Sequence, residues 1–75
     1  MDNKTERQIE FLKNYFEGLK KLISDSRKKG LDTRIAELRM MNIPLKIRYL
    51  EVSKDPKDVI KLKILLAKVE REIPK

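Results

Sequence analysis

The chain has 75 residues, of which 41% are charged, and its formal net charge is +7. It contains neither cysteine nor histidine, so disulfide bonds are excluded and the usual zinc and transition-metal ligands are missing. We therefore expect no metal ion or other cofactor. A single domain of this size buries a small core and often depends on a partner subunit for stability, so we expect a homodimer.

The composition indicates a soluble protein. No apolar run approaches the about 18 residues that span a bilayer, and the polar sequence MDNKTERQIE at the start does not resemble a signal peptide. We expect a cytoplasmic location and no membrane partner. Abundant lysine, glutamate and isoleucine, with a single glutamine, is typical of heat-adapted proteins, in which many surface lysines are only solvated.

The first predicted helix covers residues 6–29. Thr5, followed three residues later by Gln8, is typical of a capping box at a helix start, and Gly30 is a favourable residue just beyond a helix end. The predicted helix is amphipathic and about 36 Å long. Its inner face consists of apolar residues spaced three and four apart: Ile9, Leu12, Phe16, Leu19 and Ile23.

The second predicted helix covers residues 32–52 and is broken near residues 42–44. Asp32 is a suitable N-cap. Pro44 lacks a backbone N–H group and disfavours helical geometry at the residue before it, so we expect a kink or a break there. The spacing of the apolar residues in the first half predicts an inner face formed by Leu31, Ile35, Leu38 and Met41.

Residues 45–52 (LKIRYLEV) fit two structures. In a strand, Leu45, Ile47 and Tyr49 would alternate with basic residues. In a helix, two different faces would be apolar. We favour a helix, because the chain offers no convincing partner strand. The two faces would be Leu45, Tyr49 and Val52 on one side, and Ile43, Ile47 and Leu50 on the other.

The last predicted helix covers residues 56–73. Asp55, Pro56 and Asp58 are typical of an N-cap and a first helical turn. The sequence therefore predicts one all-α domain over residues 1–75, a small three-helix bundle with the middle helix kinked or broken at Pro44. The inner face of the last helix is Val59, Leu62, Leu66, Val69 and Ile73.

The residue types argue against an enzyme. General acid–base catalysis most often uses histidine, which the chain lacks. A chain this short also has little concave surface for a small-molecule substrate. We therefore expect a non-catalytic protein that has no small-molecule substrate.

Positive charge is concentrated in residues 27–50, where seven basic residues stand against two acidic ones. Such a concentration attracts an anionic partner, so the leading hypothesis is a nucleic-acid-binding protein that contacts phosphates, with DNA favoured over RNA. The first three basic residues are also explained by the helix dipole at a helix C-terminus, so the last four are the stronger candidates. The candidate site residues are Arg27, Lys28, Lys29, Arg34, Arg39, Lys46 and Arg48.

Residues 35–51 resemble a helix-turn-helix, in which a short helix leads through a tight turn into a recognition helix. The resemblance implies that Leu38 is buried, that Pro44 opens the second helix, and that Lys46 and Arg48 face the DNA. Met40 stands where the motif usually has glycine. The alternative hypothesis is a protein-interaction module, such as an adaptor or small subunit, that binds a protein partner or a second copy through the long N-terminal helix.

Overall fold

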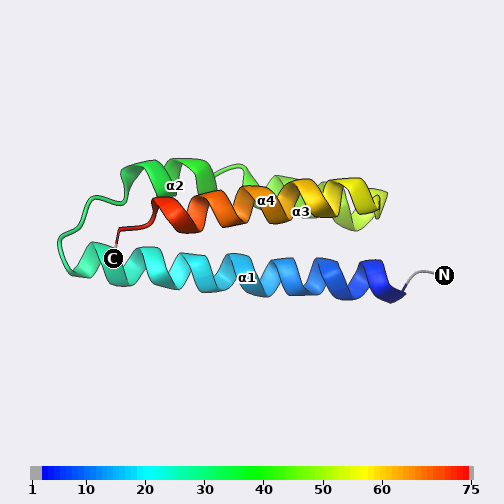
Figure 1. Cartoon of the computed structure of the whole chain (residues 1–75), viewed down its shortest axis with the longest axis horizontal. Helices are drawn as coiled ribbons and strands as arrows, with labels where there is room; N and C mark the ends of the chain where they lie inside the picture. The colour runs from blue at the N-terminus through cyan, green and yellow to red at the C-terminus, as the bar shows by residue number, and fades with distance from the viewer. Residues whose placement is uncertain (1–2, 75) are drawn as a thin grey trace.

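The apolar residues spaced three and four apart produce helices, as predicted. A computed structural model describes residues 3–74 and contains four helices: α1 (Asn3–Lys28), α2 (Arg34–Met40), α3 (Ile43–Ser53) and α4 (Pro56–Glu72). Because α2 and α3 continue in nearly the same direction, they form one arm of a three-helix bundle (Figure 1). Successive arms run antiparallel and form a rod of 46 × 16 × 16 Å. The predicted fold class is confirmed.

The start of α1 differs from the prediction. The helix begins three residues earlier, so Thr5 is not a capping residue and the predicted capping box is wrong. Thr5 is instead buried, with 2% of its surface exposed. It lies one turn before Ile9 on the same face, so packing against the core extends the helix towards its N-terminus.

The end of α1 agrees with the prediction. Gly30 has a φ of 81°, a left-handed conformation that glycine adopts without steric cost. Its N–H donates to the carbonyl of Arg27 at 2.9 Å, and the N–H of Leu31 donates to the carbonyl of Ser26 at 3.1 Å. These two bonds form a Schellman motif, which ends the helix and reverses the chain.

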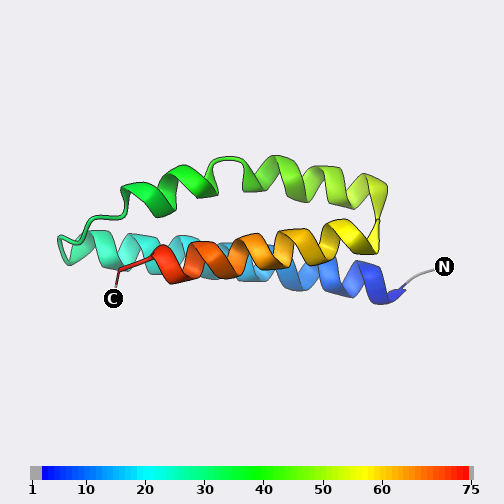
Figure 2. The same ribbon diagram turned by 45° about the horizontal axis from the view of Figure 1, so that its top comes forward.

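The core consists of one apolar stripe from each arm of the bundle. Figure 2 shows α1, the α2–α3 arm and α4 lying side by side along the rod. The predicted inner faces of the first and last helices are confirmed, since all ten residues are buried. The α2–α3 arm contributes what we call the inner stripe: Ala36, Met40, Ile43, Ile47 and Leu50.

The break in the middle arm lies just before Pro44. The chain bends by 28° at residues 41–42, and Pro44 occupies the first turn of α3. Proline has no N–H group to donate to the carbonyl of Met40, so the preceding turn tightens and the N–H of Met41 donates to Leu38 at 3.3 Å. The predicted break is therefore present in part, because the chain bends two to three residues before Pro44 and not at Pro44 itself.

The predicted inner face of the second helix is wrong. Ile35, Leu38 and Met41 are between 62% and 70% exposed, and Leu31 is half-buried. The core takes the other face of the arm, because Ala36 and Met40 continue the spacing of the buried residues of α3. Residues 45–52 are helical, so the strand alternative is excluded.

The last helix begins as the sequence predicts. α3 ends at Ser53, and its C-cap residue Lys54 adopts a left-handed conformation with a φ of 50°. The carboxylate of Asp55 then accepts the backbone N–H of Lys57 at 2.9 Å, and Pro56 takes the first helical position. The helix ends at Glu72, one residue before the predicted end.

Polar contacts along the rod and at its end join the arms. The side chain of Lys13 on α1 lies 2.6 Å from that of Glu51 on α3. The buried Ser26 hydroxyl donates to the carbonyl of Pro74 at 2.6 Å, which ties the end of the described chain to α1. The Tyr15 hydroxyl donates to the Glu70 carboxylate, and the bond raises the pKa of Tyr15.

The burial pattern predicts unequal effects for two neighbouring substitutions on α4. Leu66 is fully buried, so Leu66→Ala should lower the free energy of unfolding by about 2–5 kcal/mol. Ile64 is 52% exposed, so Ile64→Ala should change the same free energy by no more than about 0.5 kcal/mol. Urea denaturation measures both values. Equal losses at the two positions would contradict the assigned inner face.

Candidate interaction surface

The seven predicted cationic site residues divide into two groups. Three lie in ion pairs: Arg27 with Glu37 at 3.5 Å, Arg34 with Asp32 at 3.0 Å, and Arg39 with Glu72. Pairing with a carboxylate reduces the positive charge that each offers to an external anion. Within residues 3–74, no ion pair involves the other four, which are all exposed: Lys28, Lys29, Lys46 and Arg48.

The four unpaired cations do not gather on one surface. Lys28 and Lys29 lie at the C-terminal end of α1, where the helix dipole favours positive charge. Lys46 and Arg48 lie in the middle of α3. They are two residues apart, so their side chains point to different sides of the helix. The structure therefore does not bring Lys28 and Lys29 close to Lys46 and Arg48.

The α2–α3 arm also differs from a helix-turn-helix. The two helices of that motif cross at about 90–120°, whereas the bend here is 28°. Pro44 opens the second helix and Lys46 and Arg48 are exposed, as the resemblance implies. Leu38, however, is 67% exposed rather than buried, so it does not pack in the core as the resemblance implies.

The outer side of the same arm carries a second apolar stripe. Its residues follow one another at intervals of three or four, so they lie along one face of α2 and α3, opposite the inner stripe. Each side chain is at least 62% exposed. The face extends over about 26 Å, at 1.5 Å per residue. We call it the outer stripe: Ile35, Leu38, Met41, Leu45, Tyr49 and Val52.

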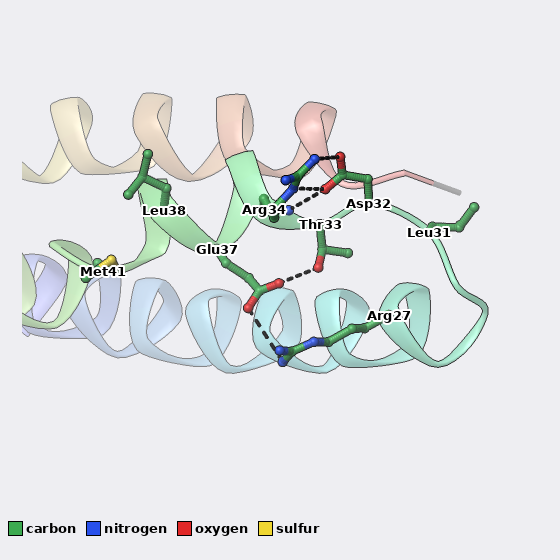
Figure 3. A pocket seen from close by; sticks show the side chains of 8 residues that line it. All are labelled: Arg27, Leu31, Asp32, Thr33, Arg34, Glu37, Leu38 and Met41. Carbon is green, nitrogen blue, oxygen red and sulfur yellow. Dashed lines mark hydrogen bonds and ion pairs between the residues drawn. The ribbon is translucent and has the colours of Figure 1, made fainter.

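An open hollow of about 570 Å³ borders the α2 end of the outer stripe. Figure 3 shows Leu38 and Met41 at its apolar side, and Arg27, Thr33 and Glu37 joined by hydrogen bonds and ion pairs across its floor. Glu37 accepts from the Thr33 hydroxyl and forms an ion pair with the Arg27 guanidinium. These contacts link α2 to α1 at the surface and leave the apolar side chains uncovered.

A second groove, of about 360 Å³, lies between α3 and α4. Leu45 and Tyr49 of the outer stripe form one wall, and the half-buried Leu65 of α4 contributes to the other. Lys46 and Lys61 also line it. The outer stripe is therefore a ridge with hollows beside it, a shape that suits the side chains of a packed helix.

Asp32 organises the turn that enters α2. The N-cap position belongs to Thr33 rather than to Asp32, which corrects the prediction. The Asp32 carboxylate nevertheless accepts the backbone N–H of Arg34 at 3.0 Å and the guanidinium N–H groups of the same residue at 3.0 and 3.1 Å. These bonds stabilise the charged carboxylate and lower the pKa of Asp32 from 3.8 to about 2.

The sequence contained the signal for the outer stripe. The apolar spacing of Ile35, Leu38 and Met41 was visible, as was that of Leu45, Tyr49 and Val52. The first three were assigned to the core, and the two sets were not joined into one face. Among residues 3–74, no cluster of His, Cys, Asp or Glu is able to hold a metal ion, and no described helix is long and apolar enough to cross a membrane.

No protein-family model, curated protein or solved structure matches this chain.

The contacts of Asp32 predict a pH dependence. A group with a lowered pKa stabilises the fold above its unfolded pKa, and this contribution is lost as the pH falls through the folded value. The free energy of unfolding should therefore fall between about pH 4 and pH 2, and Asp32→Asn should remove this part of the decrease. Carboxyl chemical shifts in NMR should show Asp32 titrating near pH 2, and Arg34→Gln should return the midpoint towards 3.8. A midpoint near pH 4 in the unmodified chain would contradict the observed contacts.

Proposed function

We propose that this chain is a non-catalytic protein-interaction module that binds a protein partner through the outer stripe of α2 and α3. The observation that carries the proposal is the continuous exposure of six large apolar side chains on one helical face. Single exposed apolar residues are ordinary on protein surfaces. A contiguous apolar patch rimmed by polar residues is characteristic of an interaction site.

The rim of the outer stripe supports the same proposal. Arg34, Glu37, Arg48 and Glu51 are polar residues of the same two helices, and Tyr49 adds an aromatic ring with a polar tip to the α3 half of the stripe. Aromatic and arginine side chains contribute strongly to binding at protein interfaces. Burial of the stripe by a partner would gain about 25 cal/mol for each Å² of apolar surface removed from water.

The proposed surface differs from the one expected on the N-terminal helix. The apolar stripe of α1 packs against α3 and α4, and Leu12 and Leu19 are each only 1% exposed. A partner would have to open the bundle to reach them. The outer stripe needs no such opening, because no described element covers it.

Site-specific photo-cross-linking tests the proposed interaction. A photoreactive phenylalanine derivative at Tyr49 should capture a protein partner in cells that make the chain, because Tyr49 is an exposed aromatic residue of the stripe. The same derivative at Ile64, an exposed residue of α4, is the matched control and should capture little. Leu38→Glu combined with Leu45→Glu should abolish capture from Tyr49 without changing the helical circular-dichroism spectrum. Equal capture at both positions, or none at either, would contradict the proposal.

Nucleic-acid binding is a second candidate function. The observation in its favour is the net charge of +7 together with four exposed cations that have no ion pair within residues 3–74. Lys46 and Arg48 would contact phosphates on either side of α3, without reading base sequence. DNA is the favoured ligand over RNA in this candidate.

Salt dependence tests the second candidate. Duplex DNA should bind detectably at about 50 mM salt, and the logarithm of the affinity should fall linearly with the logarithm of the salt concentration. Lys46→Glu with Arg48→Glu should abolish binding. Lys63→Glu with Lys68→Glu on α4 makes the same charge change and should have a smaller effect. Fluorescence anisotropy measures DNA binding by all three proteins, and the absence of binding by the unmodified chain at about 50 mM salt would reject this function.

A further inference from the structure

We infer that the partner of the outer stripe is a second copy of this chain, paired antiparallel about a two-fold axis between Asn42 and Ile43. This inference rests on the proposed function, because it identifies the partner of the same surface. A two-fold interface uses one patch on both subunits, so the patch must complement itself. The order of charges and the spacing of apolar residues along α2 and α3 both meet this requirement.

The charges beside the outer stripe alternate in an order that favours antiparallel pairing. Arg34, Glu37, Arg48 and Glu51 follow one another along one flank of the arm. When a second copy is reversed against the first, Arg34 lies opposite Glu51 and Glu37 lies opposite Arg48. Both pairs share one midpoint, between Asn42 and Ile43. A parallel two-fold pairing would set this flank against the opposite flank of the second copy, so neither of these two pairs would form.

The apolar side chains interdigitate about the same midpoint. Leu38 comes to lie between Leu45 and Tyr49 of the second copy, and Leu45 lies between Leu38 and Met41 of the second copy. Interleaving at intervals of three and four residues is how antiparallel helices fill one another's gaps. On the other flank, Lys46 faces the second copy's Arg39, whose charge Glu72 already neutralises.

The accessible surface of the chain exceeds that of a compact monomer by about the area that such an interface would bury. It measures 5798 Å², whereas a compact monomer of 8.9 kDa exposes about 4,800 Å². The excess of roughly 1,000 Å² is similar to the about 800 Å² that each partner buries in a standard interface. The rod shape of 46 × 16 × 16 Å accounts for the excess in the monomer, and pairing along the rod would remove it.

The four flanking charges are free to change partners. The side chain of Arg34 is 88% exposed although it contacts Asp32, and Glu37 and Glu51 contact Arg27 and Lys13 at the surface. Exposed ion pairs contribute little to stability, so replacing them by pairs between subunits costs little free energy. Arg48 has no ion pair within the described chain, and it would gain one.

Sedimentation equilibrium of the full chain tests the inference. The unmodified chain should be a dimer at micromolar concentrations, and Leu45→Glu should convert it to a monomer that keeps its helical spectrum. Ile64→Glu on α4 is the matched control and should remain dimeric. If the chain stays monomeric up to about 500 μM, its self-association is far weaker than that of a standard interface, and the inference is overturned. A dimer that Leu45→Glu leaves intact also overturns it.

Charge reversal tests the direction of pairing. Arg48→Glu and Glu37→Arg should each weaken the dimer about tenfold, because each creates two repulsive pairs in the symmetric interface. The double variant Glu37→Arg/Arg48→Glu restores opposite charges and should recover the original dissociation constant. Lys63→Glu on α4 controls for the change in net charge. A double variant as weak as the single variants overturns the proposed pairing.

Because the chain has no cysteine, cross-linking reports the geometry directly. Met41→Cys lies near the proposed axis and should be joined to its own copy by a short bis-maleimide. Val52→Cys should not, since two copies of residue 52 would be about 28 Å apart. Cross-linking at Val52 would indicate a parallel dimer and overturn the inference.

The outcomes separate this inference from the function on which it rests. A monomer in solution whose Tyr49 derivative captures a different protein in cells overturns self-pairing but retains the interaction surface. A monomer that captures nothing overturns both. A dimer that depends on Leu45 and recovers by charge exchange supports both.

Discussion

The structure depends on one geometrical constraint: each arm of a three-helix bundle turns only one face towards the core. α1 and α4 each carry one complete apolar stripe, and the bundle buries it. The α2–α3 arm carries two, so whichever stripe is buried, the other must face water. The core takes the inner stripe because its residues form one unbroken aliphatic series at helical spacing across α2 and α3. The outer sector contains Arg34, Arg48 and the hydroxyl of Tyr49, which are costly to bury unpaired.

Pro44 links this choice to the shape of the arm. Loss of one backbone hydrogen bond bends the chain at residues 41–42 without changing which face points inwards. The spacing from Met40 to Ile43 is still three residues, so the buried series passes through the break. A larger bend would have made α2 and α3 two separately oriented helices and divided the outer stripe into two short patches. The mild bend therefore preserves a single long surface.

Much of the fold could be predicted from residue spacing, because α1 and α4 each have only one apolar face that could form the core. Gly30 and Asp55 marked the junctions through backbone rules that act within a few residues. The inner face of α2 could not be predicted in the same way. Ile35, Leu38 and Met41 are larger and more apolar than Ala36, and only the packing of α2 against α4 shows that Ala36 is the residue in the core.

The candidate site could be predicted only in part for the same reason, because contacts between residues distant in sequence decide which charges are paired. A count along residues 27–50 finds an excess of five positive charges, but it omits partners that are distant in sequence. Arg39 pairs with Glu72, which lies outside the counted segment and contacts it only because α4 returns along α2. In the described part of the chain, ion pairs involve three of the seven cations, and helical geometry points the side chains of Lys46 and Arg48 to different sides of α3. What remains continuous on the α2–α3 arm is apolar, and an apolar ridge flanked by alternating charges specifies a protein surface more closely than it specifies a phosphate backbone.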